Sequence, residues 1–176
     1  ALGLPAYKLM GGLVRERIPM AWVVGMGTIE EMVAEAVEHV QRYGFKTVKL
    51  KIGRAPKKDF EVVKLVRQAL GPDIKIRVDA NQGYDVATAI RTLRKMEKYD
   101  LELIEQPVPR HDLLGMAEVA AALDAPIEAD ESMFDQFEAM TLIRLKACDI
   151  INIKIMKPGG LYPSKKGAAL CESASI

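Results

Sequence analysis

Residues Thr47–Ile52 read TVKLKI, a run in which two lysines alternate with aliphatic and β-branched side chains. Successive side chains of a strand point to opposite faces, so Lys49 and Lys51 would project together from one face of this segment. An edge strand with a solvated lysine face would carry the same pattern, because lysine is common on sheet edges. The stretch therefore predicts a strand, and the place of its two lysines depends on what lies on either side.

The segments that flank this strand have the spacing of amphipathic helices. Upstream, Thr28 and Glu31 form the pattern of a capping box, and Gly44 stands where a helix would end. Downstream, apolar residues recur at helical spacing over 60–70, and Gly71 closes the segment. A helix, a strand and a second helix are therefore predicted around the two lysines.

The same alternation continues along the chain. Short runs that are apolar on nearly every residue, or on alternate ones, suit strands buried on both faces of a parallel sheet. The expected strands are Ile18–Val24, Thr47–Ile52, Ile74–Val78, Leu101–Ile104, Pro126–Ala129 and Ile150–Ile155. Further helices are expected after Asp85 and over 116–123, 137–145 and 164–174. Six βα units in a row predict an α/β fold with right-handed crossovers.

Two α/β architectures fit this alternation, a (β/α)8 barrel and a doubly wound sheet. The doubly wound sheet requires a glycine-rich phosphate turn after its first strand. Gly25-Met26-Gly27 is only a fragment of that pattern, because the third glycine is absent. The barrel is favoured because polar residues stand at the ends of successive apolar strands.

A carboxylate stands at the end of three consecutive strands, at Asp79, Glu105 and Asp130. Any one of them could cap a helix or lie in a loop. In a closed barrel, however, the carboxyl ends of the strands form one mouth, and catalytic groups come from several strands. Three carboxylates that meet there would repel one another unless a cation lies between them. Oxygen ligands without His or Cys suit Mg²⁺, or Mn²⁺.

Lysines stand on either side of these carboxylates. Lys51 lies on the strand before them and Lys154 on the strand after them, so the two amines would face each other across the mouth. The pKa of a free lysine is about 10.4, too high for a base near pH 7. A neighbouring Lys49 charge and a nearby dication would both lower the pKa of Lys51. The pattern supports proton abstraction from carbon next to a carboxylate, with the metal stabilising the developing enediolate.

Length and composition exclude some classes of protein and bound the number of domains. A chain of 176 residues is long enough for one domain or for part of a larger one. Lys and Arg number 25 against 24 Asp and Glu, so a net charge of +1 gives no electrostatic case for nucleic acid. No apolar run approaches the ~20 residues of a membrane span. Cys148 and Cys171 fit a reducing cytosol, so we expect a cytoplasmic protein without a membrane partner.

Five stretches together resemble the enolase superfamily, in its muconate-lactonizing subgroup. They are Lys49-Leu-Lys51, Val78-Asp79-Ala-Asn81, Ile104-Glu105-Gln-Pro107, Ala129-Asp130-Glu131-Ser132 and Asn152-Ile-Lys154. The resemblance implies a TIM-type barrel in which Asp79, Glu105 and Asp130 hold Mg²⁺. It also implies that Lys51 and Lys154 are acid and base on opposite faces of the substrate, and that Lys49 supports Lys51.

The resemblance also implies how the chain is divided. Residues 1–16 would be the tail of an N-terminal capping domain with its linker, and residues 17–176 would form strands one to six of the barrel. The rest of the capping domain and strands seven and eight fall outside the sequence. A different class of protein therefore stays open, a catalytically incompetent barrel fragment that retains a metal site.

Within the subgroup, residues 149–160 (DIINIKIMKPGG) are most similar to dipeptide epimerases of the L-Ala-D/L-Glu type. This similarity implies a small carboxylate substrate, a dipeptide, and a homo-oligomer is possible. Muconate-type cycloisomerases and o-succinylbenzoate synthases share the scaffold and stay as alternatives, and a phosphate-binding barrel using Gly159-Gly160 is a weaker one. Lys157 either reaches the mouth or is solvated in its loop. Asn81, Asn152 and Glu131 are candidates for supporting contacts.

Overall fold

Six parallel strands lie side by side in chain order in the computed structural model, which describes residues 2–176. The strands are β1 (Trp22–Val24), β2 (Thr47–Lys51), β3 (Lys75–Asp79), β4 (Leu101–Glu105), β5 (Ile127–Ala129) and β6 (Ile150–Ile151). The helices are α1 (Ala6–Leu9), α2 (Ile29–Tyr43), α3 (Pro56–Leu70), α4 (Val86–Met96), α5 (Leu113–Ala122), α6 (Gln136–Leu145) and α7 (Leu161–Ser173), with a 3₁₀ turn at Glu97–Tyr99.

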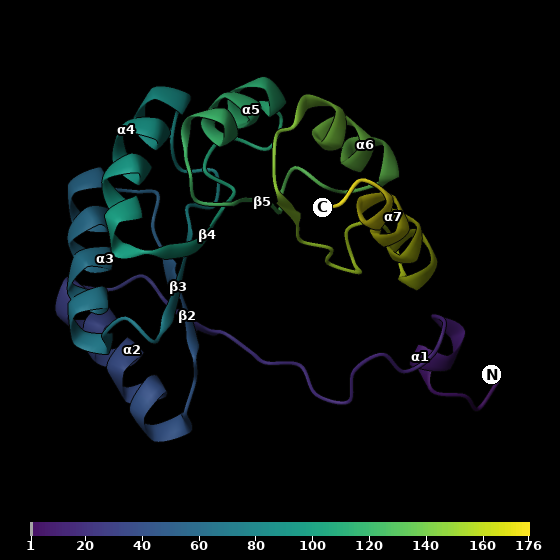
Figure 1. Ribbon diagram of the computed structural model, residues 1–176, viewed down its shortest axis with the longest axis horizontal. Helices are drawn as coiled ribbons and strands as arrows, with labels where there is room; N and C mark the ends of the chain where they lie inside the picture. Colours follow the sequence, from purple (N-terminus) through teal and green to yellow (C-terminus); the bar gives the residue numbers. More distant parts are fainter. Residues whose placement is uncertain (1) are drawn as a thin grey trace.

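The strands follow an arc, and the helices that connect them lie along its outer side (Figure 1). A doubly wound sheet would reverse its strand order and place helices on both faces. Sequential order with helices on one side is instead the arrangement of a barrel. The prediction of a (β/α)8-type barrel, covered here by six βα units, is confirmed, and the doubly wound alternative is wrong.

Two predicted strands are too long. The first was expected over Ile18–Val24 but pairs only from Trp22, which lies opposite Val48; β2 begins at Thr47, so residues 18–20 have no partner there. The sixth was expected over Ile150–Ile155 but ends at Ile151, opposite the last residue of β5. Asn152 and Lys154 therefore lie in the loop after β6 and not on the strand.

The helix boundaries follow the predicted signals. Thr28 accepts a hydrogen bond from the Glu31 N–H while the Glu31 side chain accepts one from the Thr28 N–H, so the capping box forms. Gly44 ends α2 in the left-handed conformation, with φ +73°. Asp85 caps α4 by accepting from the Thr88 N–H. The last helix begins at Leu161, three residues earlier than expected, because Pro163 in a first turn breaks no helical hydrogen bond.

The amino ends of β3 and β4 are held by one arginine from the last turn of α3. Arg67 donates to the carbonyl groups of Tyr99, Gly71, Ile74 and Asp100, at 2.8, 2.7, 2.6 and 2.9 Å. Its pKa is lowered by burial, although the charge of Asp100 opposes the shift. We call this end of the sheet the floor. It is the end opposite to the one where the carboxylates were predicted.

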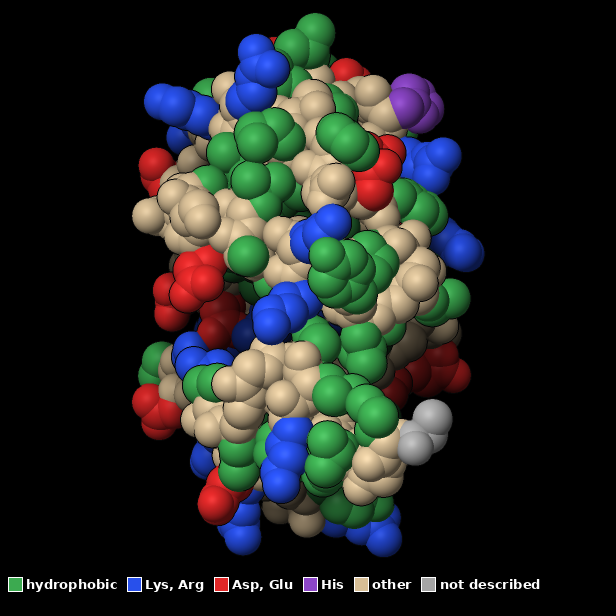
Figure 2. Space-filling view, turned by 90° about the vertical axis from the view of Figure 1, so that its right-hand side faces the viewer, with side chains coloured by type: hydrophobic (Ala, Val, Ile, Leu, Met, Phe, Trp, Pro, Cys, Tyr) green, Lys and Arg blue, Asp and Glu red, His purple; other side chains and the backbone are tan. Residues whose placement is uncertain are grey.

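The side of the molecule on which α1 and α7 lie carries apolar side chains among lysines (Figure 2). A hollow of about 560 Å³ there is lined by Leu9 and Met10 of the N-terminal segment and by Leu161, Tyr162 and Lys165 of α7. The assignment of residues 1–16 to a capping domain stays a prediction, and Ala1 lies outside the described residues. Among residues 2–176, no helix is both long enough and apolar enough to cross a membrane.

Candidate active site

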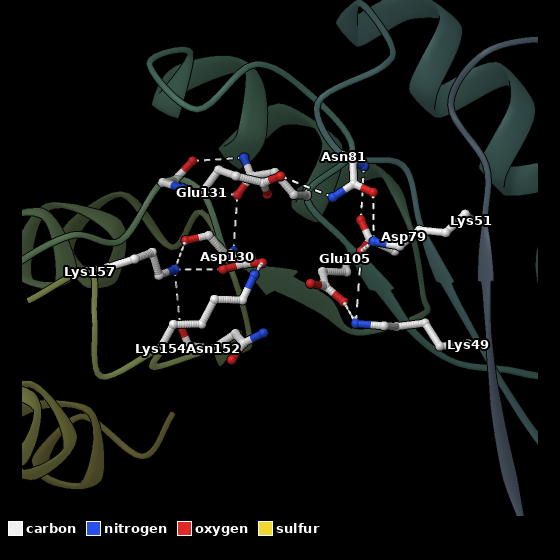
Figure 3. A network of polar contacts seen from close by, with 12 residues as sticks. Lys49, Lys51, Asp79, Asn81, Glu105, Asp130, Glu131, Asn152, Lys154 and Lys157 are labelled. Carbon is white, nitrogen blue, oxygen red and sulfur yellow. Dashed lines mark hydrogen bonds and ion pairs between the residues drawn. The ribbon is translucent and has the colours of Figure 1, made fainter. Parts of the chain in front are cut away.

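The register of the sheet brings the predicted carboxylates to one level. Lys51 lies opposite Asp79 in the pairing of β2 with β3, and Asp79 lies opposite Glu105 in the pairing of β3 with β4. Asp130 follows the end of β5, two residues after the position opposite Glu105. The side chains of Asp79, Glu105 and Asp130 are each only 1% exposed. We call this carboxyl end of the sheet the mouth, and Figure 3 shows Glu105 between the other two carboxylates.

Two lysines of β2 reach this row from one side. Lys51 Nζ donates to Asp79 Oδ2 at 2.6 Å and to Asn81 Oδ1 at 2.7 Å. Lys49 Nζ donates to Glu105 Oε2 at 2.7 Å and lies 3.8 Å from Asp79 Oδ2. Lys49 thus contacts the same carboxylate row as Lys51, and its supporting role for Lys51 stays a prediction.

Two further lysines reach Asp130 from the other side. Lys154 Nζ donates to Asp130 Oδ2, and its side chain is 49% exposed. Lys157 Nζ donates to Asp130 Oδ1 at 2.6 Å and to the Asp130 carbonyl, and its side chain is only 10% exposed. Lys51 and Lys154 therefore lie at opposite ends of the carboxylate row, as Figure 3 shows. The open question over Lys157 is settled, since its amine reaches the mouth.

Burial and the lysine hydrogen bonds shift the pKa values of the carboxylate row in opposite directions. Burial raises the pKa of Glu105 to about 7, and the nearby Asp79 charge adds to the shift, although the hydrogen bond from Lys49 opposes it. Burial acts in the same direction on Asp130, but hydrogen bonds from Lys154 and Lys157 outweigh it and hold the pKa of Asp130 below its ordinary value. The hydrogen bond to Asp130 in turn raises the pKa of Lys154.

The donor set at the mouth fits a hard divalent cation. Buried carboxylates on neighbouring strands are the ligands that Mg²⁺ and Mn²⁺ prefer, and no His or Cys is among them. The neighbouring Glu131 has one carboxylate oxygen, Oε2, that is buried without a hydrogen-bond partner. As they stand among residues 2–176, no three acidic, His or Cys side chains converge into a ready ligand set. The lysine amines hold the oxygens instead, so a cation would have to displace them.

The loops after β2 and β3 are pressed together beside Lys51. A Cβ on Gly53, whose φ is +98°, would lie 2.2 Å from the Ala80 carbonyl oxygen, and one on Gly83 would lie 2.1 Å from the Gly53 oxygen. Buried Asp59 of α3 accepts from the Gly53 N–H at 3.1 Å and from the Tyr84 hydroxyl at 2.7 Å. These contacts fix the loop backbone that frames Lys51.

Two hollows lie beside Lys51, next to the loops after β2 and β3. One, of about 260 Å³, is lined by Lys51, Arg54 and Lys58 with apolar Met26 and Met32; the other, of about 280 Å³, is lined by Lys51 and Asn81. Each is large enough for part of a small molecule. The site therefore has space on the Lys51 side of the carboxylate row.

Two supporting residues of the mouth, Gln106 and Ser132, were not predicted from the sequence. Gln106 is fully buried and Ser132 nearly so, and they connect the ends of β4 and β5 through hydrogen bonds. Both lie in the sequence stretches that contain Glu105 and Asp130. No sequence pattern, however, distinguishes a supporting Gln or Ser next to a carboxylate from one on the surface. Asn81 donates to Glu131 Oε1 at 3.0 Å, so these two predicted supporting residues do meet.

Residues 31–176 match the family described as Enolase C-terminal domain-like, and the chain belongs to this family. It is 40% identical over 172 residues to the L-Ala-D/L-Glu epimerase of Clostridium acetobutylicum, covering 97% of this chain and 48% of that protein. It is 34% identical over 177 residues to a chloromuconate cycloisomerase of Delftia acidovorans, again covering 48% of the relative. The chain thus spans about half the length of these curated relatives.

A solved structure leads to the same group of proteins. The dipeptide epimerase of Enterococcus faecalis, complexed with Mg and the dipeptide L-Leu-L-Tyr, superimposes with a TM-score of 0.92 at 39% identity. The match covers 97% of this chain and 48% of that one. The predicted resemblance to the enolase superfamily is confirmed, and the relatives named here are isomerases.

Proposed function

We propose that the protein carrying this chain removes and returns the proton on the carbon next to a carboxylate, and that its substrate is a dipeptide. The observation that supports this most is the position of Lys51 and Lys154 at opposite ends of one row of three buried carboxylates. Two amines on opposite sides of a planar carbon suit epimerisation, because one can take the proton and the other can deliver one to the opposite face.

Asp79, Glu105 and Asp130 are the proposed metal ligands. One Mg²⁺ ion bound by them would hold the substrate carboxylate, stabilise the charge that develops on it, and compete with the lysine amines for the carboxylate oxygens. Lys154 is hydrogen-bonded to Asp130, and this bond raises its pKa. When the amine gives up that bond, the main cause of the raised pKa is removed, and the pKa of Lys154 falls back toward its ordinary value.

Lys51 is the proposed partner on the other face. Its amine is held by Asp79 and Asn81, and Asn81 is held in turn by Glu131, so the orientation of the side chain is fixed from two sides. Lys49, bonded to Glu105 and close to Asp79, adds a positive charge to the same edge of the site. The hollows lined by Lys51 leave room for a substrate beside it.

The decisive experiment is α-proton exchange by the full-length protein in deuterated solvent, with L-Ala-L-Glu and Mg²⁺. We expect exchange in the wild type. Lys51→Ala should abolish exchange from one enantiomeric face only, and Lys154→Ala from the other. Lys75→Ala, at the floor end of β3, is the matched control and should leave both exchanges intact. The absence of exchange with every dipeptide tested would refute the dipeptide assignment.

A second candidate is cycloisomerisation of a muconate-type substrate. The similarity to the chloromuconate cycloisomerase favours it, because the same mouth could protonate or deprotonate carbon next to a carboxylate in a lactone. Lactone formation from muconate, without exchange of dipeptide protons, would select this candidate. If the full-length protein binds Mg²⁺ but processes neither substrate, a metal-binding barrel without this catalytic activity is the better account.

A further inference from the structure

Gln106 is the one fully buried side-chain amide among the residues described as buried, and it lies directly after Glu105 at the end of β4. Its backbone has φ +38°, a left-handed conformation that costs a residue other than glycine of order 1 kcal/mol or more. A buried amide in a strained backbone persists only when the surroundings hold it. The contacts of the side chain show what does so.

Every hydrogen-bonding position of this amide is used. Oε1 accepts from the Asp130 N–H at 3.0 Å and from the Ser132 N–H at 3.1 Å. Nε2 donates to the Val108 carbonyl at 3.0 Å and to the Ser132 hydroxyl at 2.8 Å. Two N–H donors on one side and two oxygen acceptors on the other allow only one orientation of the amide. The side chain therefore spans from the end of β4 to the end of β5.

The sheet does not make this connection by itself. In the pairing of β4 with β5, the last matched pair is Glu105 with Glu128, and β5 ends at Ala129. Asp130 therefore lies beyond the regular ladder, and its N–H goes to the Gln106 side chain instead of to a strand backbone. The Gln106 N–H still donates to the Glu128 carbonyl at 2.9 Å, but the Asp130 N–H is held by the Gln106 side chain.

We propose that Gln106 is a positioning residue that sets the place of the Asp130 carboxylate relative to Glu105, by holding the Asp130 N–H. The inference rests on the proposed function, in which these two carboxylates share a divalent cation. Gln106 touches neither cation nor substrate in this scheme. Its effect on the site is transmitted through the backbone of Asp130, and it is separable from the contribution that the same amide makes to stability.

The chain offers a matched pair of variants that separates the two contributions. Gln106→Met removes all four hydrogen bonds of the amide, the one from the Asp130 N–H among them. Ser132→Ala removes the bond from Gln106 Nε2 and the bond that the Ser132 hydroxyl donates to the Arg110 carbonyl, but it leaves Gln106 Oε1 as the acceptor for the Asp130 N–H. Both variants should be destabilised, since each leaves buried polar groups without partners. Only Gln106→Met should displace Asp130.

Two measurements on each folded variant decide the question. In Gln106→Met, hydrogen exchange of the Asp130 N–H should accelerate by more than the loss of global stability alone explains. In Ser132→Ala, it should accelerate by no more than that loss explains. Calorimetric titration with Mg²⁺ should show affinity reduced at least about tenfold in Gln106→Met, the size typical when support of a metal ligand is lost, and near wild type in Ser132→Ala. If Gln106→Met does not fold, Gln106→Asn, which keeps a neutral amide but is one methylene too short, takes its place.

The outcomes separate this inference from the proposed function. If neither exchange nor Mg²⁺ affinity distinguishes the two variants, Gln106 is only a structural residue and the inference is overturned. If the wild type binds no Mg²⁺ at all, the proposed metal site fails, and the exchange of the Asp130 amide alone decides whether Gln106 holds that residue. The inference is also overturned if both variants lose Mg²⁺ affinity and the slow exchange of the Asp130 N–H in proportion to their loss of stability.

Discussion

The mouth and the floor of the sheet both hold charged groups, buried at the mouth and half-buried at the floor, but they neutralise them in opposite ways. At the floor, one guanidinium, that of Arg67, is surrounded by four neutral carbonyl groups. At the mouth, three carboxylates from neighbouring strands lie close together, and lysine amines from the flanking segments neutralise them. The floor cluster holds one charge among neutral groups, whereas at the mouth burial raises the pKa of Glu105 to about 7 and the Asp79 charge adds to the shift.

The comparison teaches how to tell a supporting cluster from a site. Carbonyl dipoles around one cation are all favourable, and nothing in the cluster is left to bind anything else. Buried carboxylates held together by lysine amines can exchange those amines for another cation, so a cluster of this kind is a candidate ligand site. In barrels of this kind, groups at the carboxyl ends of strands serve function and those at the amino ends serve stability. The following changes test that division, from the largest expected effect on unfolding free energy to the smallest.

Arg67→Met should destabilise most. It removes four hydrogen bonds from a charged donor and leaves carbonyl groups of two strand ends without partners, which we expect to cost about 3 kcal/mol. Urea unfolding followed by circular dichroism measures the loss. Arg94→Met, an exposed arginine on α4, is the control and should change stability little. Equal losses of stability in the two variants would show that the hydrogen bonds of Arg67 do not stabilise the floor.

Gly53→Ala should destabilise the mouth by about 2 kcal/mol or more, because it combines a positive φ with a clash against the Ala80 carbonyl. Gly44→Ala is the matched control, since its φ is also positive but nothing lies within 4 Å of the added Cβ. The difference between the two, measured by urea unfolding, isolates the steric contribution. If Gly44→Ala costs as much as Gly53→Ala, the loops after β2 and β3 are not pressed together as described.

Glu105→Gln should leave the free energy of unfolding within about 1 kcal/mol of wild type, because burial already makes the charged form costly at this position. Its effect on the site should be large, with Mg²⁺ affinity reduced by at least about tenfold. Calorimetric titration measures the affinity. Glu128→Gln, opposite Glu105 in the register, is the control that keeps the proposed ligands. A Glu105→Gln variant that binds Mg²⁺ as tightly as wild type contradicts the proposed ligand set.

Glu102, near the floor end of β4, should have the smallest effect, which is present near neutral pH and disappears in acid. Burial by itself would raise its pKa, but hydrogen bonds from Arg77 and Lys75 outweigh burial and hold the pKa below the ordinary value of 4.5. The folded state then binds this proton less readily than the unfolded state. The stabilisation is complete above pH 4.5 and is lost as the pH falls through the lower folded pKa.

Urea unfolding between pH 3 and 7 checks this. We expect Glu102→Gln to lose less stability on acidification than the wild type, by under about 1 kcal/mol because the ion pairs are partly solvated. Parallel pH profiles of the two proteins would show that these ion pairs add nothing to stability.

The amino-acid sequence determined the class of fold, because the alternation of apolar runs with amphipathic segments is a local property. It also determined the carboxylates and lysines of the mouth, since one polar residue at the end of each buried strand stands out in an apolar background. It overestimated the first and sixth strands, because a strand ends where its neighbour ends, and the ends of β2 and β5 are not visible from residues 18–24 or 150–155.

Only the tertiary structure decided which groups meet. The register that aligns Lys51, Asp79 and Glu105 across three strands depends on the hydrogen bonds of the whole sheet. The burial of Lys157 against Asp130 depends on how a loop folds back, and the amide of Gln106 reaches Asp130 only because two strand ends lie side by side. Propensity and periodicity act between near neighbours in sequence, whereas these contacts join residues 24–28 positions apart, whose proximity exists only after the sheet has formed.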